Sequence, residues 1–243
     1  MPLHTVVVVA DAHLGSADPA DAAAFLRFLD AVPDLGRHLV INGDLFDFWF
    51  EYRSVIPRRA FPVLSALHRL RGRGVAITLT GGNHDRWGGP FWTDELGATF
   101  LGRGGSLDLA GWRAFLHHGD GLVERHVAAR VMHAVTRWPL TAAAFRLLHP
   151  DLGIRLVHAM SGLLAESTRD GPALDRAAAA QAGWAREYLA RNSAVDLVVL
   201  AHTHRAACEA AGDRRWYLNP GPWMGERRYA VVDAQGPALR AFD

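Results

Sequence analysis

Cysteine is nearly missing from this 243-residue chain, and its scarcity excludes a fold stabilised by disulfides. Cys208 is the only cysteine, so no internal disulfide can form. This usage is typical of a reducing compartment and predicts a cytoplasmic protein. Long apolar runs are missing too, because no stretch approaches the roughly 20 apolar residues that span a bilayer. The start, MPLHTVVVVADAH, lacks a basic flank and predicts a buried strand rather than a signal peptide.

A strong charge of one sign is also absent. The net charge is +1, so no overall field draws the chain to nucleic acid, and we expect no nucleic-acid partner. No pattern implies a protein partner. Half of the residues are hydrophobic and 21% are charged, as in a globular chain with a sizeable core. Histidine is the exception to this ordinary composition, with 13 residues.

Short apolar runs alternate with helical patterns, and this alternation predicts an α/β fold. The expected strands are residues 5–10, 38–42, 75–80 and 195–201, and the expected helices are residues 18–32 and 58–74. Asp18 is the expected cap of the first helix. Residues 106–118 predict a hairpin that turns at Ala110-Gly111.

Residues 121–194 differ from the rest, because they have no strong strand pattern and are rich in Ala, Leu and Arg. We interpret them as a helical insertion, a cap or lid. Residues 1–120 and 195–243 then form the core, within one structural domain overall.

Five apolar runs end in Asp, Asn or His. The clusters are Asp11 and His13, Asp44 and Asp47, Asn83 with His84 and Asp85, His118 and Asp120, and His202 and His204. In open α/β sheets, ligands bind beyond the carboxyl ends of the strands. Strand ends that are neighbours in space would therefore bring these side chains together.

Each cluster taken alone has an ordinary structural explanation. An Asn-His-Asp after two glycines, or an Asn-Gly-Asp, commonly forms a turn. His202 and His204 could simply share one face of a strand, because alternate residues point the same way. Five such endings in one chain favour a common site.

The order of the clusters resembles the calcineurin-like metallophosphoesterases. The motifs are D-x-H, G-D-x-x-D, G-N-H-D, H-G-D and x-H-x-H, and they span Asp11 to His204. The usual glycine of the last motif is replaced here by Ala201. Four further segments resemble the UDP-2,3-diacylglucosamine diphosphatases of lipid A synthesis, in the branch with His in Gly-Asn-His-Asp: GDLFDFWFEYRSVIPR, HGDGL, LHPDLGI and YLNPGPW. Many members have Arg at the position of His84.

The resemblance implies a site for two divalent metal ions, Mn²⁺ with Fe²⁺ or Zn²⁺ as alternatives. It assigns Asp11, His13 and His204 to the first ion, Asn83, His118 and His202 to the second, and Asp44 as the bridge. It implies that Asp47, Asp85 and Asp120 accept hydrogen bonds from ligand N–H groups. The His-Gly-Asp motif of the family assigns the metal ligand to His118 rather than to its neighbour His117. We interpret Asp44 and His84 as catalytic, and Asn83, His84 and His202 as substrate contacts.

The resemblance further implies hydrolysis of the diphosphate of UDP-2,3-diacylglucosamine, giving UMP and 2,3-diacylglucosamine 1-phosphate. The insertion would then hold the acyl chains, with Trp138, Phe145 and Leu148 as candidate lining residues. Its arginines would contact phosphate or the inner membrane surface, making the protein peripheral on the cytoplasmic face. Two alternatives remain: a phosphodiesterase or nucleotide pyrophosphatase of the same fold on a soluble substrate, and a non-catalytic metal-binding protein. The alternative for the insertion is a set of helices that only pack on the core, with solvated arginines.

Overall fold

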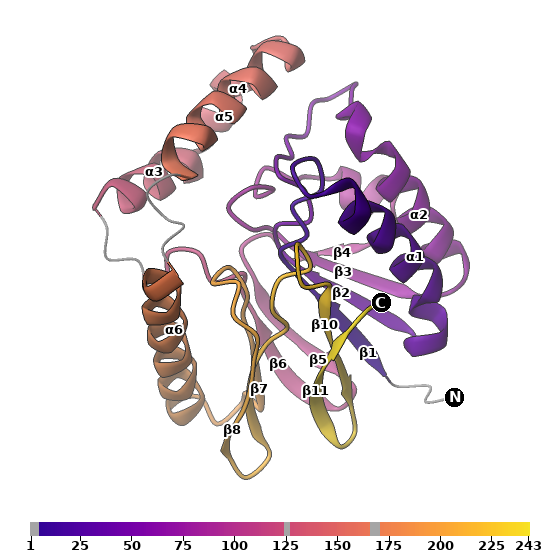
Figure 1. Ribbon diagram of the computed structural model, residues 1–243, viewed down its shortest axis with the longest axis vertical. Helices are drawn as coiled ribbons and strands as arrows, with labels where there is room; N and C mark the ends of the chain where they lie inside the picture. The colour runs from indigo at the N-terminus through magenta and orange to yellow at the C-terminus, as the bar shows by residue number, and fades with distance from the viewer. Residues whose placement is uncertain (1–4, 124–126, 166–170) are drawn as a thin grey trace.

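Two β-sheets stack face to face in the computed structural model, which describes residues 5–123, 127–165 and 171–243 (Figure 1). The first sheet has the order β11-β10-β1-β2-β3-β4. Its strands are β1 (Val6–Val9), β2 (His38–Asn42), β3 (Ala76–Thr80), β4 (Thr99–Phe100), β10 (Arg228–Asp233) and β11 (Gly236–Ala241). Strands β1 to β4 pair in parallel, so the carboxyl ends of β1, β2 and β3 lie along one edge.

The second sheet has the order β5-β6-β7-β9-β8. Its strands are β5 (Gly105–Leu109), β6 (Trp112–Leu116), β7 (Leu197–Val199), β8 (Ala207–Gly212) and β9 (Arg215–Asn219). Strands β6, β7 and β9 pair in parallel. The predicted hairpin is confirmed: β5 and β6 pair antiparallel, and Ala110 and Gly111 both have positive φ, at 55° and 84°.

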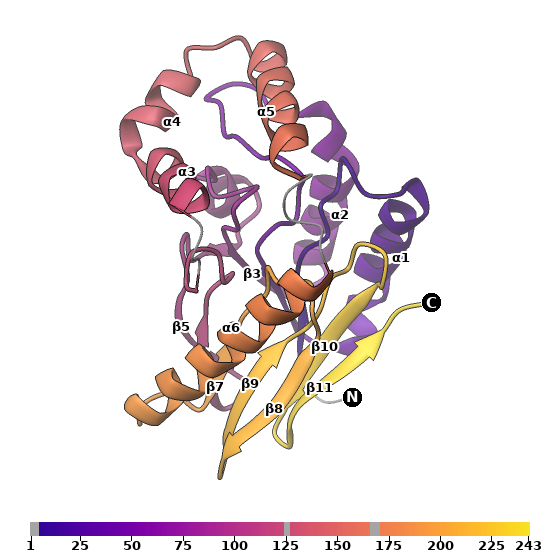
Figure 2. The same cartoon turned by 60° about the vertical axis from the view of Figure 1, so that its left-hand side comes forward.

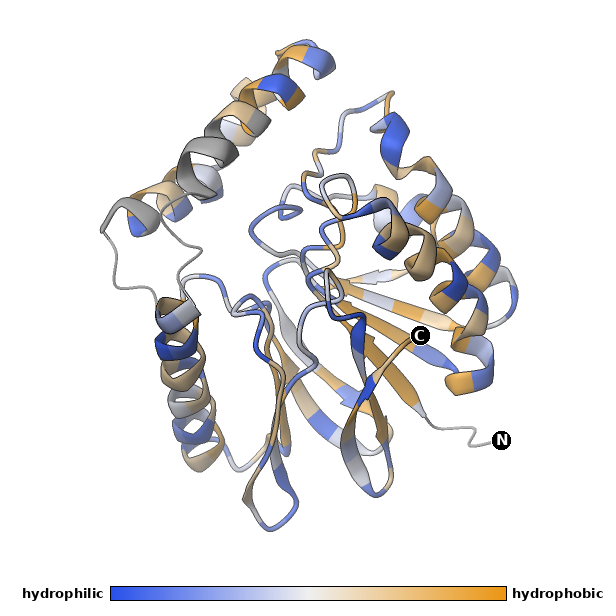
Figure 3. Ribbon diagram, viewed as in Figure 1, coloured by the Kyte–Doolittle hydropathy of each residue, from blue (hydrophilic) through white to orange (hydrophobic). Residues whose placement is uncertain are grey.

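The two-residue period of a strand explains the layering. Val7 and Val9 face a core shared with the first two helices, whereas Val6 and Val8 face the core between the sheets. All four valines are buried on both faces of the first sheet, as a continuous apolar run predicts. Figure 3 shows the ribbon of β1 in orange, toward the hydrophobic end of the scale.

Helices cover both outer faces, so the predicted α/β sandwich flanked by helices is confirmed. Helix α1 (Pro19–Leu35) and helix α2 (Phe61–Gly72) cover the first sheet. Asp18 caps α1, since its carboxylate accepts a 2.7 Å hydrogen bond from the backbone N of Ala20. A 3₁₀ turn, η1 (Arg58–Ala60), precedes α2. Strand β4 and a short π-helical turn, η2 (Phe91–Glu95), have no counterpart in the prediction.

The predicted insertion is helical where the structure describes it; residues 124–126 and 166–170 lie outside the described residues. It contains α3 (Val127–Arg137), α4 (Pro139–Phe145), α5 (Pro150–Ala165) and α6 (Gly171–Arg191). Helix α6 packs on the outer face of the second sheet, through Ala185 and Leu189 among others. Helices α3 to α5 lie together above the strand ends (Figure 2), and we call them the cap. The division at residues 121 and 194 stays a prediction.

The cap is anchored to the core by aromatic packing. Phe145 is only 8% exposed, and its ring lies 4.7 Å from that of Phe50 and 5.2 Å from that of Trp87. The indole N–H of Trp87 donates to the carbonyl of Thr136 on α3 at 2.8 Å. Phe145 therefore contacts the core rather than standing free to line a groove.

Candidate metal centre

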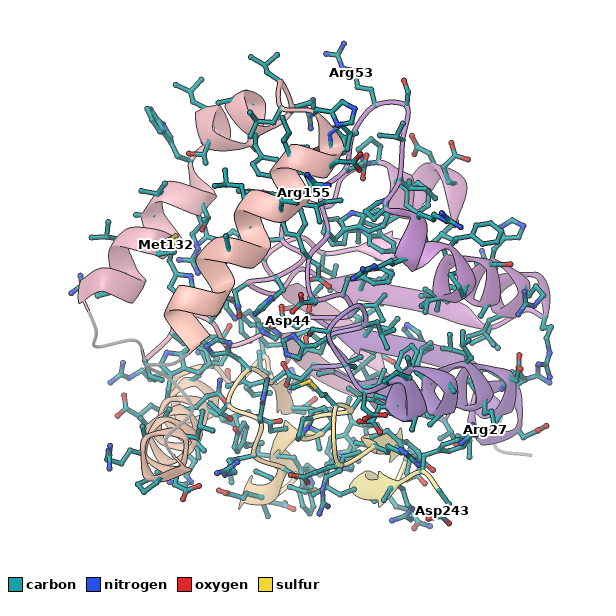
Figure 4. The ribbon with its side chains drawn as sticks, turned by 45° about the horizontal axis from the view of Figure 1, so that its top comes forward. Arg27, Asp44, Arg53, Met132, Arg155 and Asp243 are labelled. Carbon is teal, nitrogen blue, oxygen red and sulfur yellow. The ribbon has the colours of Figure 1, made fainter. Side chains whose placement is uncertain are left out.

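Five strand ends deliver the predicted ligands to one place. Asp11 and His13 follow β1, Asp44 follows β2, and Asn83 follows β3. His118 follows β6 of the second sheet, and His202 and His204 follow β7. Asp44 lies near the middle of the molecule, between the core and the cap (Figure 4).

Three groups of candidate ligand atoms occur among the described residues, each with its atoms within 4.8 Å of one another. They are Asp11 with His13 and His204, His13 with Asp44 and His84, and Asp44 with His118 and His202. The first group contains the three residues predicted for the first ion. The third contains Asp44 and two of those predicted for the second ion. Asp44 joins both halves, because its Oδ2 lies 3.9 Å from His13 Nε2 and 3.1 Å from His118 Nε2.

Three buried ligand atoms make no hydrogen bond within the described protein, although two of them lie at ion-pair distance from neighbouring side chains. Asp11 Oδ1, Asn83 Oδ1 and His118 Nε2 are buried without a hydrogen-bond partner. A buried unsatisfied polar atom costs about 1–3 kcal/mol, so three in one cluster need an explanation. Carboxylate oxygen, amide oxygen and imidazole nitrogen all bind divalent cations such as Mn²⁺, Fe²⁺ and Zn²⁺, and the residues present fit such ions.

The backbone is strained at the same positions. Five of the predicted ligands have positive φ without being glycine: Asp11 (51°), His13 (45°), Asp44 (51°), His202 (71°) and His204 (51°). Such conformations cost about 1–3 kcal/mol each and persist where the surroundings impose them, most often at functional sites. These conformations occur in the tight turns that direct the five side chains toward the centre of the site, so we attribute the strain to the binding of metal ions.

Hydrogen bonds to backbone carbonyls fix the imidazole tautomers. The Nδ1 of His118 lies 2.9 Å from the carbonyl of Asn42. A carbonyl can only accept, so Nδ1 carries the hydrogen and Nε2 faces Asp44.

The backbone N–H of His202 donates to Asp11 Oδ2 at 3.0 Å, which links the ends of β7 and β1.

The site carries strong mutual electrostatic effects. Burial opposes ionisation of Asp44, yet His118 and His84 nearby hold the pKa of its carboxyl well below its usual value. Burial likewise opposes the charge on His118, but the Asp44 and Asp11 carboxylates raise its pKa well above the usual value. Burial and, to a smaller extent, the charge on His118 lower the pKa of His202 to about 4. The negative potential that attracts a proton to His118 would equally attract a divalent cation.

Two of the predicted acceptors, Asp85 and Asp120, hydrogen-bond backbone amides and arginines in the structure. Asp85 accepts from backbone N–H groups: those of Gly82 at 2.8 Å, Leu45 at 2.7 Å and Asp44 at 3.2 Å. It lies inside the turn after β3, where the amides of two loops point at it. Burial and, to a smaller extent, the Asp44 carboxylate raise the pKa of its carboxyl to about 6.

Asp120 pairs with two arginines, one from the turn after β3 and one from the end of α3. Arg86 and Arg137 both lie 3.0 Å from its Oδ2. Burial opposes its ionisation, but His118 and Arg86 lower its pKa to about 2. The third predicted acceptor, Asp47, accepts a 2.7 Å hydrogen bond from Nδ1 of His84 through its backbone carbonyl. Its carboxylate lies 3.9 Å from the same nitrogen.

His84 lies beside the ligands. Its backbone N–H donates to Asp44 Oδ1 at 2.9 Å, and its ring centroid is 4.8 Å from that of His13. Because Nδ1 donates to a carbonyl, Nε2 is the nitrogen available for a substrate or an ion. His117 is in none of the three groups found among the described residues; its Nδ1 accepts from the backbone N of Gly119 at 2.8 Å.

Sequence reasoning missed a residue that holds the loop after β7. Gln181 on α6 is fully buried, and its side-chain amide donates to the carbonyl of Ala201 at 3.1 Å. Its carbonyl oxygen lies 3.2 Å from the hydroxyl of Tyr217. The signal was a lone polar residue within AAAAQAG, since a buried polar side chain in an apolar helix face needs partners.

Comparison with known proteins identifies the family of this chain. The profile described as Calcineurin-like phosphoesterase matches residues 4–206. The chain belongs to the calcineurin-like phosphoesterase family. This family uses a dinuclear divalent metal site, and its members are metal-dependent hydrolases.

Curated relatives match over nearly the full chain. A Porphyromonas gingivalis protein named UDP-2,3-diacylglucosamine hydrolase is 30% identical over 258 residues, covering 98% of this chain and 97% of its own. A Bordetella pertussis protein of the same name is 33% identical over 259 residues, covering 97% and 93%. Among solved structures, a dimetal phosphatase from Danio rerio is 11% identical, covers 100% of both chains and has a TM-score of 0.47. Within the described residues, no helix is both long and apolar enough to cross a membrane.

Proposed function

We propose that this chain is a dimetal hydrolase that cleaves the diphosphate of UDP-2,3-diacylglucosamine, giving UMP and 2,3-diacylglucosamine 1-phosphate. The observation that carries the proposal is the convergence of seven potential ligands, three with unsatisfied buried atoms, at five strand ends. The substrate is supported by relatives named UDP-2,3-diacylglucosamine hydrolase that align along nearly the whole chain.

The ligand assignment follows the groups in the site. Asp11, His13 and His204 would hold the first ion, Asn83, His118 and His202 the second, and Asp44 both. We propose Mn²⁺ as the metal. When bound, two such ions supply charge neutralisation of the phosphate groups and a hydroxide nucleophile at neutral pH. The protein itself orients the ligands through Asp85, whose carboxylate holds the turns that carry Asp44 and Asn83.

His84 would act on the substrate. Its Nδ1 is held by the carbonyl of Asp47, so Nε2 is positioned to hydrogen-bond a phosphate oxygen or, from the imidazolium, to protonate the leaving oxygen. We place Asn83 and His202 beside it as further contacts to the phosphate groups. The second predicted catalytic residue, Asp44, would act by holding the two halves of the site together.

The cap would cover the acyl chains as a lid. It exposes an unusual number of large apolar side chains: Val131, Val135, Trp138, Leu140, Leu147, Leu148, Leu152 and Leu156. Leu147 is 88% exposed and Trp138 59%. Large exposed apolar side chains, where they form a patch, mark binding sites for lipid or protein. Arg155 on α5 lies above Asp44 (Figure 4), and such arginines would meet phosphate or the cytoplasmic face of the inner membrane.

The deciding experiment measures UMP release by the purified protein with Mn²⁺. Wild-type activity is compared on UDP-glucosamine lipids with long, short and no acyl chains, with Asp44→Ala as the inactive control. We expect kcat/KM to fall as the chains shorten, because each buried CH₂ is worth about 0.8 kcal/mol. If acyl length makes no difference, a phosphodiesterase or nucleotide pyrophosphatase acting on a soluble substrate replaces this proposal.

A further inference from the structure

A small cavity next to the candidate metal centre is lined by three arginines. Its volume is about 70 Å³, several times the roughly 10–15 Å³ that one water needs. Its walls come from the turn after β3, the loop before β5, the strand end after β6, and α3. None of the seven proposed metal ligands lines it.

The charges around this cavity do not balance. Arg86 and Arg137 share one oxygen of Asp120, each at 3.0 Å. The third arginine, Arg103, forms no ion pair with an acidic side chain of the described residues. Among the lining side chains, three guanidinium groups stand against one carboxylate, an excess of two positive charges; the Asp44 carboxylate acts on Arg86 from outside the lining. Like charges held together in this way are unfavourable unless an anion joins them.

Two further groups can donate hydrogen bonds there. The Nε of Arg86 is buried and has no partner in the described part of the chain. His117 accepts from the Gly119 amide through Nδ1, so in the neutral ring the hydrogen lies on Nε2. Guanidinium N–H groups match the geometry of tetrahedral oxyanions, which accept several such bonds at once.

We propose that this cavity is a second anion site that binds a phosphate dianion, separate from the metal centre. The two unbalanced positive charges match the charge of a phosphate monoester or of inorganic phosphate at neutral pH. Both sources offer the same chemistry: free phosphate, or the monoester group of a nucleotide such as UMP. The site uses only side chains of this protein and requires neither bound metal nor turnover.

Calorimetric titration of the full chain, purified with Mn²⁺, tests the proposal with inorganic phosphate in one arm and UMP in the other. The key variant is Arg103→Met, because Arg103 is exposed and has no ion-pair partner to lose among the described residues. Arg27→Met is the matched control: it is an exposed arginine on α1, far from Asp44 in Figure 4. Unchanged melting temperatures show that both variants fold.

We expect Arg103→Met to weaken binding at this site about tenfold or more, as for loss of a hydrogen bond between charged groups, and Arg27→Met to leave it unchanged. Arg137→Met should give the same loss. Phosphate inhibition of bis-p-nitrophenyl phosphate hydrolysis reports the metal centre, and it should not change in Arg103→Met. An effect on UMP alone identifies the nucleotide phosphate as the ligand, and an effect on inorganic phosphate identifies the free anion. Binding of both ligands that is independent of Arg103 and Arg137 overturns the proposal, whether or not the protein is a hydrolase.

Discussion

Gly82 leaves the space that Asp44 occupies, and replacing it tests how closely the site is built. A Cβ at position 82 would overlap Oδ1 of Asp44 and lie 2.7 Å from both its Cγ and its backbone N. Asp44 cannot easily yield, because Oδ1 accepts from the His84 amide and its own amide donates to Asp85. Gly82→Ala should therefore displace the proposed bridging carboxylate.

The expected cost follows from overpacking a buried site. An added methyl group in a well-packed interior destabilises by about 1–3 kcal/mol. For a chain of this size, each kcal/mol lowers Tm by about 2–4 °C, so Tm should fall by about 2–12 °C. The functional effect should be larger, because one displaced carboxylate weakens binding of both ions.

The assay combines elemental analysis of bound Mn²⁺, turnover of a phosphodiester and thermal unfolding. Gly183→Ala is the matched control, since the same change in α6 meets nothing within 4 Å and should stabilise the helix by up to about 1 kcal/mol. We expect Gly82→Ala to lose metal and activity while the control keeps both. Wild-type metal content and turnover in Gly82→Ala would refute the assignment of Asp44 as the bridge.

Four further outcomes are expected. Asp44→Ala should lose both ions and nearly all activity but remain folded; metal-free active wild-type protein would contradict the dimetal site. His84→Ala should keep its metal content and lower kcat by about 10²–10⁴-fold, and normal turnover would make this histidine structural. Leu148→Glu in the cap should raise KM for the acylated substrate and hardly change hydrolysis of bis-p-nitrophenyl phosphate; equal effects on both substrates would count against a lid. Burial lowers the pKa of His38 in the folded protein, so this imidazole binds a proton more readily in the unfolded chain than in the folded one. The free energy of unfolding then falls as pH drops below about 6.5, and His38→Gln, which can still bond Thr78, should lose less stability in acid than wild type by thermal unfolding.

Local patterns of the sequence determined the strands and the types of residue that follow them. The apolar run before Asp11 predicts a buried strand, because β-branched residues without polar interruption suit a strand covered on both faces. The Ala110-Gly111 turn and the Asp18 cap depend on neighbours within a few residues, and both were predicted. The strand-end positions of the candidate ligands followed from the same periodicity.

Only the tertiary structure decided which partner each polar side chain found. Asp85 binds the amides of Asp44 and Leu45, about 40 residues earlier in the chain, and Gln181 binds a loop that precedes β8. The arginines of the proposed anion site come from three separate segments. Periodicity reports which face of an element is apolar, but not which distant element lies against it. Burial then forces every enclosed polar group to find a partner, and the fold determines which groups are within reach.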